Sequence, residues 1–285
     1  MKFLIGFIVT IGCVLGGFVL HEGKLAVLNQ PTEFLIIVGA AVGSFIISNS
    51  GKNIKDILKS LKLLFKGMPF KKADYLELLV MLYATFKLMR SKGMLEMESH
   101  VENPENSSLF SKYPKFLHNH HACHYLCDYV RLMTIGVDDY YQLEELMERE
   151  LDVHRKHGEH LSHAIVTMAD AMPALGIVAA VLGVIVTMGS ITEPPEVLGH
   201  LIGAALVGTF LGVLLSYGFI APMGRYIGEY YADEVKYMGC IKVALLAHIK
   251  GNAPAVSVEF ARTSIGVHEK PDFLDVEQAC QNAAS

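Results

Sequence analysis

Tryptophan is absent from this sequence, and charged residues are scarce at 19%, against roughly 25% in typical soluble domains. With hydrophobic residues at 52%, this balance excludes an ordinary soluble globule and indicates an integral membrane protein with a sizeable soluble part. The small net charge of −5 gives no support to nucleic-acid binding. Five cysteines without a disulfide-like spacing are typical of a reducing compartment.

Four apolar stretches are candidates for membrane spans, which need about 20 residues each. They cover residues 3–20, 34–48, 171–191 and about 201–223. A signal peptide is the alternative for the first stretch. Its apolar run is longer than a typical signal-peptide core, however, and no small-residue cleavage site precedes His21. The pattern therefore favours four transmembrane helices.

Lysine is distributed unevenly between the loops, and cytoplasmic loops carry the excess of Lys and Arg in membrane proteins. The loop before the second stretch has only Lys24, and the loop between the third and fourth stretches has none. A run of lysines follows the second stretch: Lys52, Lys55, Lys59, Lys62, Lys66, Lys71 and Lys72. We therefore expect both termini and the long segment 49–170 to lie in the cytoplasm.

The cytoplasmic part shows helical periodicity. Apolar residues recur at helical spacing over 54–65 and over 73–92, where Gly93 ends the run, and "ENPENSS" at 102–108 predicts a turn. Residues 137–160 predict a charged helix that continues towards the third span.

The fourth helix is expected to reach about Lys250 and to stop at Gly251 and Pro254, while the tail 255–285 has no clear pattern. We predict an all-α membrane protein, with a large helical cytoplasmic domain between spans 2 and 3 and a helical cytoplasmic segment at the C-terminus. Its parts are two transmembrane helices in 1–48, the cytoplasmic domain in 49–170, two transmembrane helices in 171–224, and the C-terminal segment in 225–285.

Small residues line one side of each span. The third carries Pro173, Gly176, Ala180, Gly183 and Thr187 in one stripe, and the fourth carries Ala205, Thr209, Gly212 and Ser216. Such stripes let helices approach closely in lipid, which explains the glycines fully. The hydroxyl groups have two interpretations that the sequence leaves open: interhelical packing, or the lining of a polar path.

Within these four stretches there is no Asp, Glu, Lys, Arg or His; Asp170 and His200 stand only at the edges. Proton relays across membranes normally use such residues. If this chain conducts ions, we therefore expect another chain to supply the carboxylate.

The stretch "ALVGTFLGVLLSYGFIAP" at 205–222 resembles the signature of the flagellar motor stator proteins of the MotA family, with Ala205, Gly208, Thr209, Gly212 and Pro222 at the family's spacing. "PALGIVAAVLGV" at 173–184, "GSFII" at 43–47 and "VEFAR" at 258–262 are also similar to the family. The resemblance implies a proton-conducting stator subunit of the bacterial inner membrane. Several copies would surround a MotB dimer, which carries the proton-binding Asp, and would move against the rotor protein FliG.

The resemblance also implies roles for particular residues. Pro173 and Pro222 match the paired prolines thought to couple ion flow to movement. Arg90 and Glu98 match the rotor-facing charges, with Glu150 a weaker candidate of the same kind. Thr209 matches a pore-lining Thr, and Ser216 is a second candidate on the same stripe.

Ala180 matches a position where sodium-driven relatives carry Thr. Because its methyl group offers no oxygen to a dehydrated cation, protons are favoured over sodium as the transported ion. No cofactor is expected.

"HNHHACHYLCD" at 118–128 departs from the family. His120, Cys123, His124 and Cys127 would share a helix face and are candidate zinc ligands. Four ligands from one straight helix close a tetrahedron poorly. The favoured interpretation is a helix with its cysteines packed inward and its histidines in water.

Three other functions are weighed against the stator. An energy-transducing channel subunit of the ExbB and TolQ type is the main alternative, although those relatives have three spans. A stand-alone transporter is disfavoured because no inverted repeat or broken helix pair is evident. An enzyme is disfavoured because no catalytic constellation lies in or beside the spans.

Overall fold

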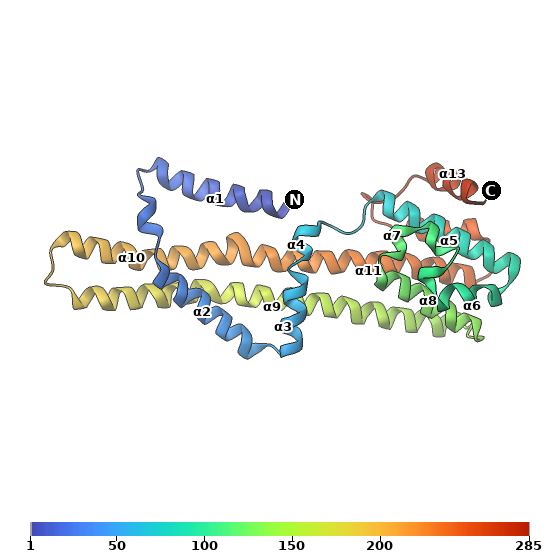
Figure 1. Cartoon of the computed structure of the whole chain (residues 1–285), viewed down its shortest axis with the longest axis horizontal. Helices are drawn as coiled ribbons and strands as arrows, with labels where there is room; N and C mark the ends of the chain where they lie inside the picture. Colours follow the sequence, from blue (N-terminus) through green and yellow to red (C-terminus); the bar gives the residue numbers. More distant parts are fainter. Residues whose placement is uncertain (1, 285) are drawn as a thin grey trace. The chain divides into compact units, whose positions relative to one another are not determined.

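A computed structural model describes residues 2–284, which fold into helices and connecting turns with no strand among them (Figure 1). The chain forms two compact units. Unit 1 comprises Met1–Gly67 and His157–Tyr230, and unit 2 comprises Met68–Lys156 and Tyr231–Ser285. The four predicted domains were drawn from the expected membrane boundaries rather than from contacts, and they stay a prediction.

Unit 1 begins with α1 (Lys2–Leu20), the short 3-10 turn η1 (Leu25–Leu28) and α2 (Pro31–Ser48). The helix α2 starts earlier than its apolar run predicts, because Pro31 occupies its first turn, where a missing backbone N–H costs nothing. The short helices α3 (Gly51–Ser60) and α4 (Leu63–Lys66) follow, and the Ser50 hydroxyl caps α3 by accepting from the Asn53 amide at 3.3 Å.

The third and fourth spans belong to helices that are longer than a membrane requires. The helix α9 runs from Tyr140 to Gly189, so the predicted charged helix and the third span are one element. The helix α10 (Pro195–Val213) starts before the predicted residue 201. It continues through a π-helical segment, Leu214–Ile220, into α11 (Ala221–Ile249), which ends where predicted.

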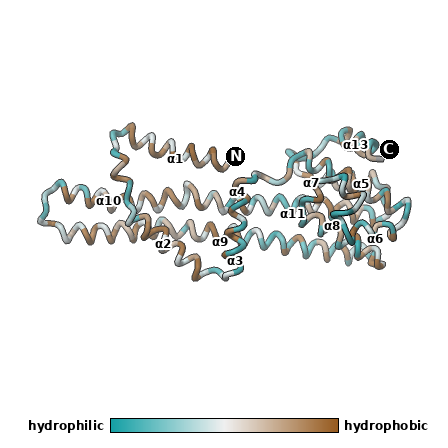
Figure 2. Tube along the Cα trace, viewed as in Figure 1, coloured by the Kyte–Doolittle hydropathy of each residue, from teal (hydrophilic) through white to brown (hydrophobic). Residues whose placement is uncertain are grey.

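Four helical segments are long and apolar enough to cross a membrane, and each overlaps one of the four predicted spans; the third ends at Gly189, two residues before the predicted end. In unit 1 the hydrophobic residues lie along α1, α2, α10 and the second half of α9 (Figure 2). Many of them are exposed, such as Ile8, Ile47 and Val186. Because such a surface suits lipid and not water, unit 1 is the membrane part of a multi-pass membrane protein.

Unit 2 contains α5 (Lys72–Lys92), α6 (Met94–Glu102), α7 (Pro114–Leu117), α8 (His120–Thr134) and parts of α9 and α11. Gly93 separates α5 from α6 with a φ of +85°, which glycine adopts without strain. Two helices that the sequence did not predict complete the unit: α12 (Pro254–Thr263) and α13 (Phe273–Ala284). Its core is built from large side chains, including Tyr75, Phe86, Phe110, Phe116, Tyr125 and Tyr237.

Candidate functional site

The helices α9 and α10 meet along a seam of small residues. A Cβ atom placed on Gly176 would lie 2.8 Å from the Gly208 carbonyl oxygen, and one on Gly212 would lie 2.6 Å from the Met172 carbonyl oxygen. One on Gly183 would lie 2.7 Å from the Ala205 Cβ. No side chain fits at such distances, so the glycines allow backbone to contact backbone, as the sequence predicts.

Two predicted pore-lining residues lie on this seam. Thr209 is half-buried, and its Cα would be 3.3 Å from a methyl group on Gly176. Ala180 is half-buried on α9, and its amide nitrogen would be 3.3 Å from a methyl group on Gly208. The seam therefore brings Thr209 and Ala180 into the same stretch of the helix pair, while their role in a pore stays a prediction.

Ser216, the third predicted pore residue, lies farther along, within the π-helical segment. Its side chain is fully buried, and its Oγ has no hydrogen-bond partner within the described structure. A buried hydroxyl without a partner is unfavourable, so packing alone gives no reason for a serine here. Its role in a polar path stays a prediction.

The π-helical segment has a local cause in Pro222, the second residue of α11. Proline has no N–H to donate to the carbonyl four residues earlier, Gly218, and its ring clashes with that turn of an α-helix. In the wider π turn the Ala221 amide donates instead to the Ser216 carbonyl, five residues back. The sequence indicated a kink at Pro222 but not its form.

Pro173 interrupts the hydrogen bonds of α9 without ending the helix. It removes the donor to the Ala169 carbonyl, and it directly follows Met172, whose carbonyl faces Gly212 across the seam. Both prolines thus lie where helix hydrogen bonding is disturbed, which is compatible with the predicted coupling role. That role stays a prediction.

One functional candidate was missed by the sequence reasoning. Glu33 lies in the first turn of α2, is only 7% exposed, and its Oε2 has no hydrogen-bond partner in the described part of the chain. A methyl group on Gly208 would lie 3.0 Å from this oxygen, so the carboxyl group reaches α10. The apolar stretch 34–48 has no ionisable residue, but the helix that contains it does. Pro31 was the signal, since it predicts a helix that starts before Glu33.

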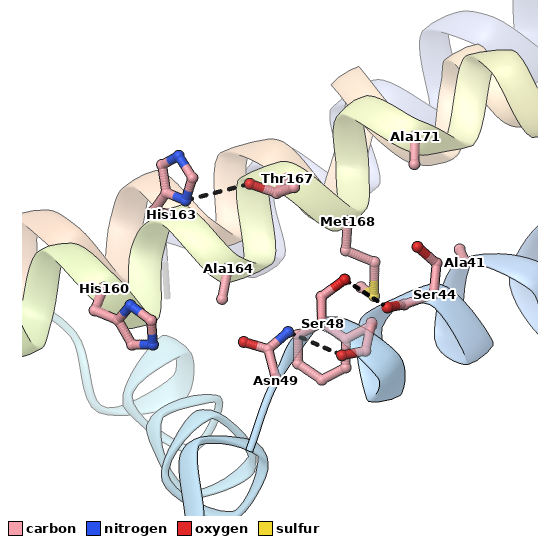
Figure 3. A pocket seen from close by; sticks show the side chains of 11 residues that line it. Ala41, Ser44, Ser48, Asn49, His160, His163, Ala164, Thr167, Met168 and Ala171 are labelled. Carbon is pink, nitrogen blue, oxygen red and sulfur yellow. Dashed lines mark hydrogen bonds between the residues drawn. The ribbon is translucent and has the colours of Figure 1, made fainter. Parts of the chain in front are cut away.

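At its other end, α2 lines a cavity with α9. The cavity has a volume of about 280 Å³, and Figure 3 shows that Ser44, Ser48 and Asn49 come from the end of α2, whereas His160, His163 and Thr167 come from α9. His163 Nδ1 and Thr167 Oγ1 are 3.3 Å apart, and Asn53 Nδ2 lies 2.8 Å from His160 Nε2. Apolar side chains, among them Phe45 and Met168, complete the lining, so polar and apolar groups meet at the C-terminal end of α2.

The predicted rotor-facing residues all belong to unit 2. Arg90, at the end of α5, and Glu98, on α6, are both exposed, and neither forms an ion pair with another described residue. Glu150 differs because its carboxylate accepts a hydrogen bond of 2.7 Å from the Tyr129 hydroxyl. Arg90 and Glu98 are therefore available to a partner, whereas Glu150 is engaged within its own unit.

The candidate zinc ligands on α8 point in two directions. Cys123 and Cys127 are buried in the core of unit 2, while His120 and His124 are exposed. The hydrogen bond with Cys123 and burial raise the pKa of the Cys127 thiol, although zinc binding requires thiolates. Among the described residues no group of three or more His, Cys, Asp or Glu side chains is placed to hold a metal ion. The burial of the two cysteines and the exposure of the two histidines confirm the predicted helix with inward cysteines.

Comparisons with known proteins give the class first. Residues 120–239 match the MotA/TolQ/ExbB proton channel family, and residues 4–93 match the motility protein A N-terminal family. The chain is 41% identical to motility protein A of Escherichia coli over 98% of its own length and 94% of that protein. It therefore belongs to the motility protein A branch of the proton channel family, whose members are flagellar stator subunits.

Two solved structures have the same fold. The MotAB structure of C. jejuni superposes with a TM-score of 0.78 at 20% identity, covering 93% of this chain and 96% of that one. The flagellar MotAB stator complex of Bacillus subtilis gives 0.76 at 22% identity, covering 94% and 98%. The all-α fold with four spans is therefore that of stator proteins.

Proposed function

We propose that this chain forms the wall of a proton-driven flagellar stator and acts as a mechanochemical channel part, not as an enzyme. Several copies surround a partner of the MotB type, whose single membrane helix supplies the proton-binding Asp. The observation that carries this proposal is the α9–α10 seam, where Thr209 lies and to which neither of the two helices contributes a carboxylate. A path lined in this way needs a proton carrier from another chain.

The transported ion is a proton in this proposal, and no cofactor takes part. Ala180 offers only a methyl group beside the seam, and a dehydrated sodium ion needs several oxygen ligands. A proton needs only one acceptor at a time, so hydroxyl groups and water suffice between carboxylates.

The rotor contact is assigned to unit 2. Arg90 and Glu98 present opposite charges that are exposed and form no ion pair with another described residue, and they would meet complementary charges on FliG. Such contacts are transient and are screened by salt, which suits a motor that must release its rotor after each step.

Movement is assigned to the two prolines. One proton that crosses 100 mV supplies about 2.3 kcal/mol, so the two states of the stator can differ by only a few kcal/mol. A change at Pro173 or beside Pro222 can shift such a balance, because each proline already lacks a helix hydrogen bond.

The chain lies in the bacterial inner membrane with both termini in the cytoplasm, as the lysines of 52–72 favour.

The experiment that tests the proposal measures proton flux into liposomes, with a pH-sensitive dye, for the purified chain alone and for its complex with the single-span partner. The complex should conduct, and the chain alone should conduct almost nothing. Robust flux without the partner would contradict the proposal.

Deletion of the gene should abolish swimming and leave nutrient uptake intact, whereas the reverse result would favour an energy transducer of the ExbB type.

A further inference from the structure

Glu33 is the one buried carboxyl group of the described spans that the proposed function does not use. It is 7% exposed, and its Oε2 has no hydrogen-bond partner within the described residues. A glutamate in the first turn of a helix usually accepts from backbone N–H groups at that end. Here the carboxyl group turns instead towards the neighbouring helix α10.

The surroundings of this oxygen are specific. A methyl group on Gly208 would lie 3.0 Å from Glu33 Oε2, 3.1 Å from the Ala179 Cβ and 3.3 Å from the Ala180 nitrogen. The carboxyl group therefore lies where α2 meets the seam, beside the residue that precedes Thr209. A methyl group at position 208 would contact it tightly.

Neither Gly208 nor the two alanines at this place can titrate or neutralise a charge. On α10 the nearest titratable groups are Glu196 and His200, and α9 has none from Ala171 to Gly189. Glu22 and Lys24 lie in the connection before η1. An ionised carboxylate without a partner is costly in such a place, and the cost disappears when the carboxylate binds a proton.

We propose that Glu33 is a proton-binding site of this chain's own, located between the outer surface and the partner's Asp. This inference rests on the proposed function and adds a second carboxyl group to its path. A proton from outside water forms an O–H bond at Glu33. That bond then breaks as the proton passes through water to the partner's ionised carboxylate, and Glu33 is left ready for the next proton.

The test uses the full chain in complex with its single-span partner in liposomes. Glu33→Gln keeps the size and polarity of the side chain but cannot exchange a proton, so the flux should fall at least about tenfold, as for loss of a proton-transfer group. Glu33→Asp keeps a carboxyl group and should retain part of the flux. The matched control is Glu196→Gln, on the exposed first turn of α10, which should conduct like the wild type.

A second readout does not depend on flux. Infrared difference spectra of the wild-type complex, recorded as the pH is changed, should contain a carboxyl C=O band that Glu33→Gln lacks and Glu33→Asp shifts. If the Gln variant does not assemble, the spectra of the wild type and of Glu33→Asp test the inference. A carboxyl band that does not respond to pH in the wild type, or that does not shift in Glu33→Asp, overturns it. Equal flux in the wild type and Glu33→Gln also overturns it, while an inactive wild-type complex would overturn the proposed function itself.

Discussion

The two units are packed by opposite means. In unit 1 the helices touch through Gly176, Gly208 and Gly212, and one cluster of its core consists of Ile37, Ala41, Met172 and Ala179. In unit 2 the interior is filled by rings, with Phe70 stacked on Tyr237 at 4.1 Å. Water drives large side chains inward, whereas lipid gives no such drive and leaves close backbone contact as the source of stability.

Charges follow the same division. Unit 2 carries surface ion pairs such as Lys72–Asp272 at 2.6 Å and Arg131–Glu102 at 2.7 Å. The spans of unit 1 carry Glu33, buried and without a partner for its Oε2 among the described residues. A polar group in water is easily satisfied and contributes little. In a membrane it is costly, and its presence points to function. The predictions below test this contrast, starting with the largest effect.

Phe110→Ala should give the largest loss of stability. Phe110 is fully buried in unit 2, and truncation of a core phenylalanine costs about 3–5 kcal/mol. Hydrogen exchange followed by mass spectrometry should show faster exchange in peptides of unit 2 and unchanged exchange in α2 and α10. The control is Leu95→Ala, at a position that is 80% exposed in the same unit. Faster exchange in both units would contradict separate packing.

Gly212→Val should disrupt unit 1 instead. Its Cβ would lie 2.6 Å from the Met172 carbonyl oxygen, and overpacking of this kind costs about 1–3 kcal/mol or more. We expect lower yields of folded protein from membranes and faster hydrogen exchange in α9 and α10, but not in α5 or α8. Gly43→Val is the matched control on α2, because a Cβ atom there would meet no atom within 4 Å. Equal yields for both variants would argue against the seam.

His248 should make unit 2 sensitive to acid. Burial, and then the charge of Arg90, hold the pKa of His248 below its ordinary value of 6.5, and the ring is stacked on Phe86 at 4.5 Å. The unfolded chain therefore binds this proton more readily, so stability is complete above about pH 6.5 and declines as the pH falls towards the folded-state pKa. The slope is at most about 1.4 kcal/mol per pH unit.

Thermal unfolding between about pH 5 and 8 measures this effect. His248→Gln should flatten the acid side of the profile, whereas His124→Gln, on the exposed face of α8, should leave it unchanged. A wild-type profile without this decline would show that another group controls the acid response.

Two buried hydroxyl groups give the smallest and most direct comparison. In unit 2, Thr85 donates a hydrogen bond of 2.9 Å to the Met81 carbonyl, whereas Ser216 in unit 1 has no partner among the described residues. Thr85→Val should therefore cost about 1 kcal/mol, and Ser216→Ala should be neutral or slightly stabilising by thermal unfolding. If Ser216→Ala costs as much as Thr85→Val, the serine is a packing residue with a partner of its own.

Most of the fold could be predicted from the sequence. The four spans follow from long apolar runs, and the breaks at Gly93 and Gly251 follow from glycine, which adopts a φ of +85° at the first and +84° at the second. The helices α12 and α13 were missed because they are short and depend on contacts with α5, which local periodicity does not record. Pro254 was interpreted as a stop, yet it starts α12.

The candidate site was less predictable. The seam was visible in the spacing of its glycines, because helical periodicity alone places Gly208 and Gly212 on one side. Glu33 was not, since a search for apolar residues ends the span at Phe34 and ignores what Pro31 says about the helix start. The π-helical segment and the unpartnered Ser216 hydroxyl depend on how α10 passes into α11, which no local pattern specifies.

The π turn before Pro222 also determines in which directions the side chains of α11 point around the helix axis. An α-helix advances about 100° per residue, so the one additional residue held in a π turn rotates everything after it by about that angle. Ser216 is buried and Pro222 is exposed on either side of the turn, and α11 continues from there to Ile249. Deleting a single residue from Leu214–Ile220 would leave the composition of the helix almost unchanged. It would nevertheless rotate each side chain of α11 to a different direction around the helix axis.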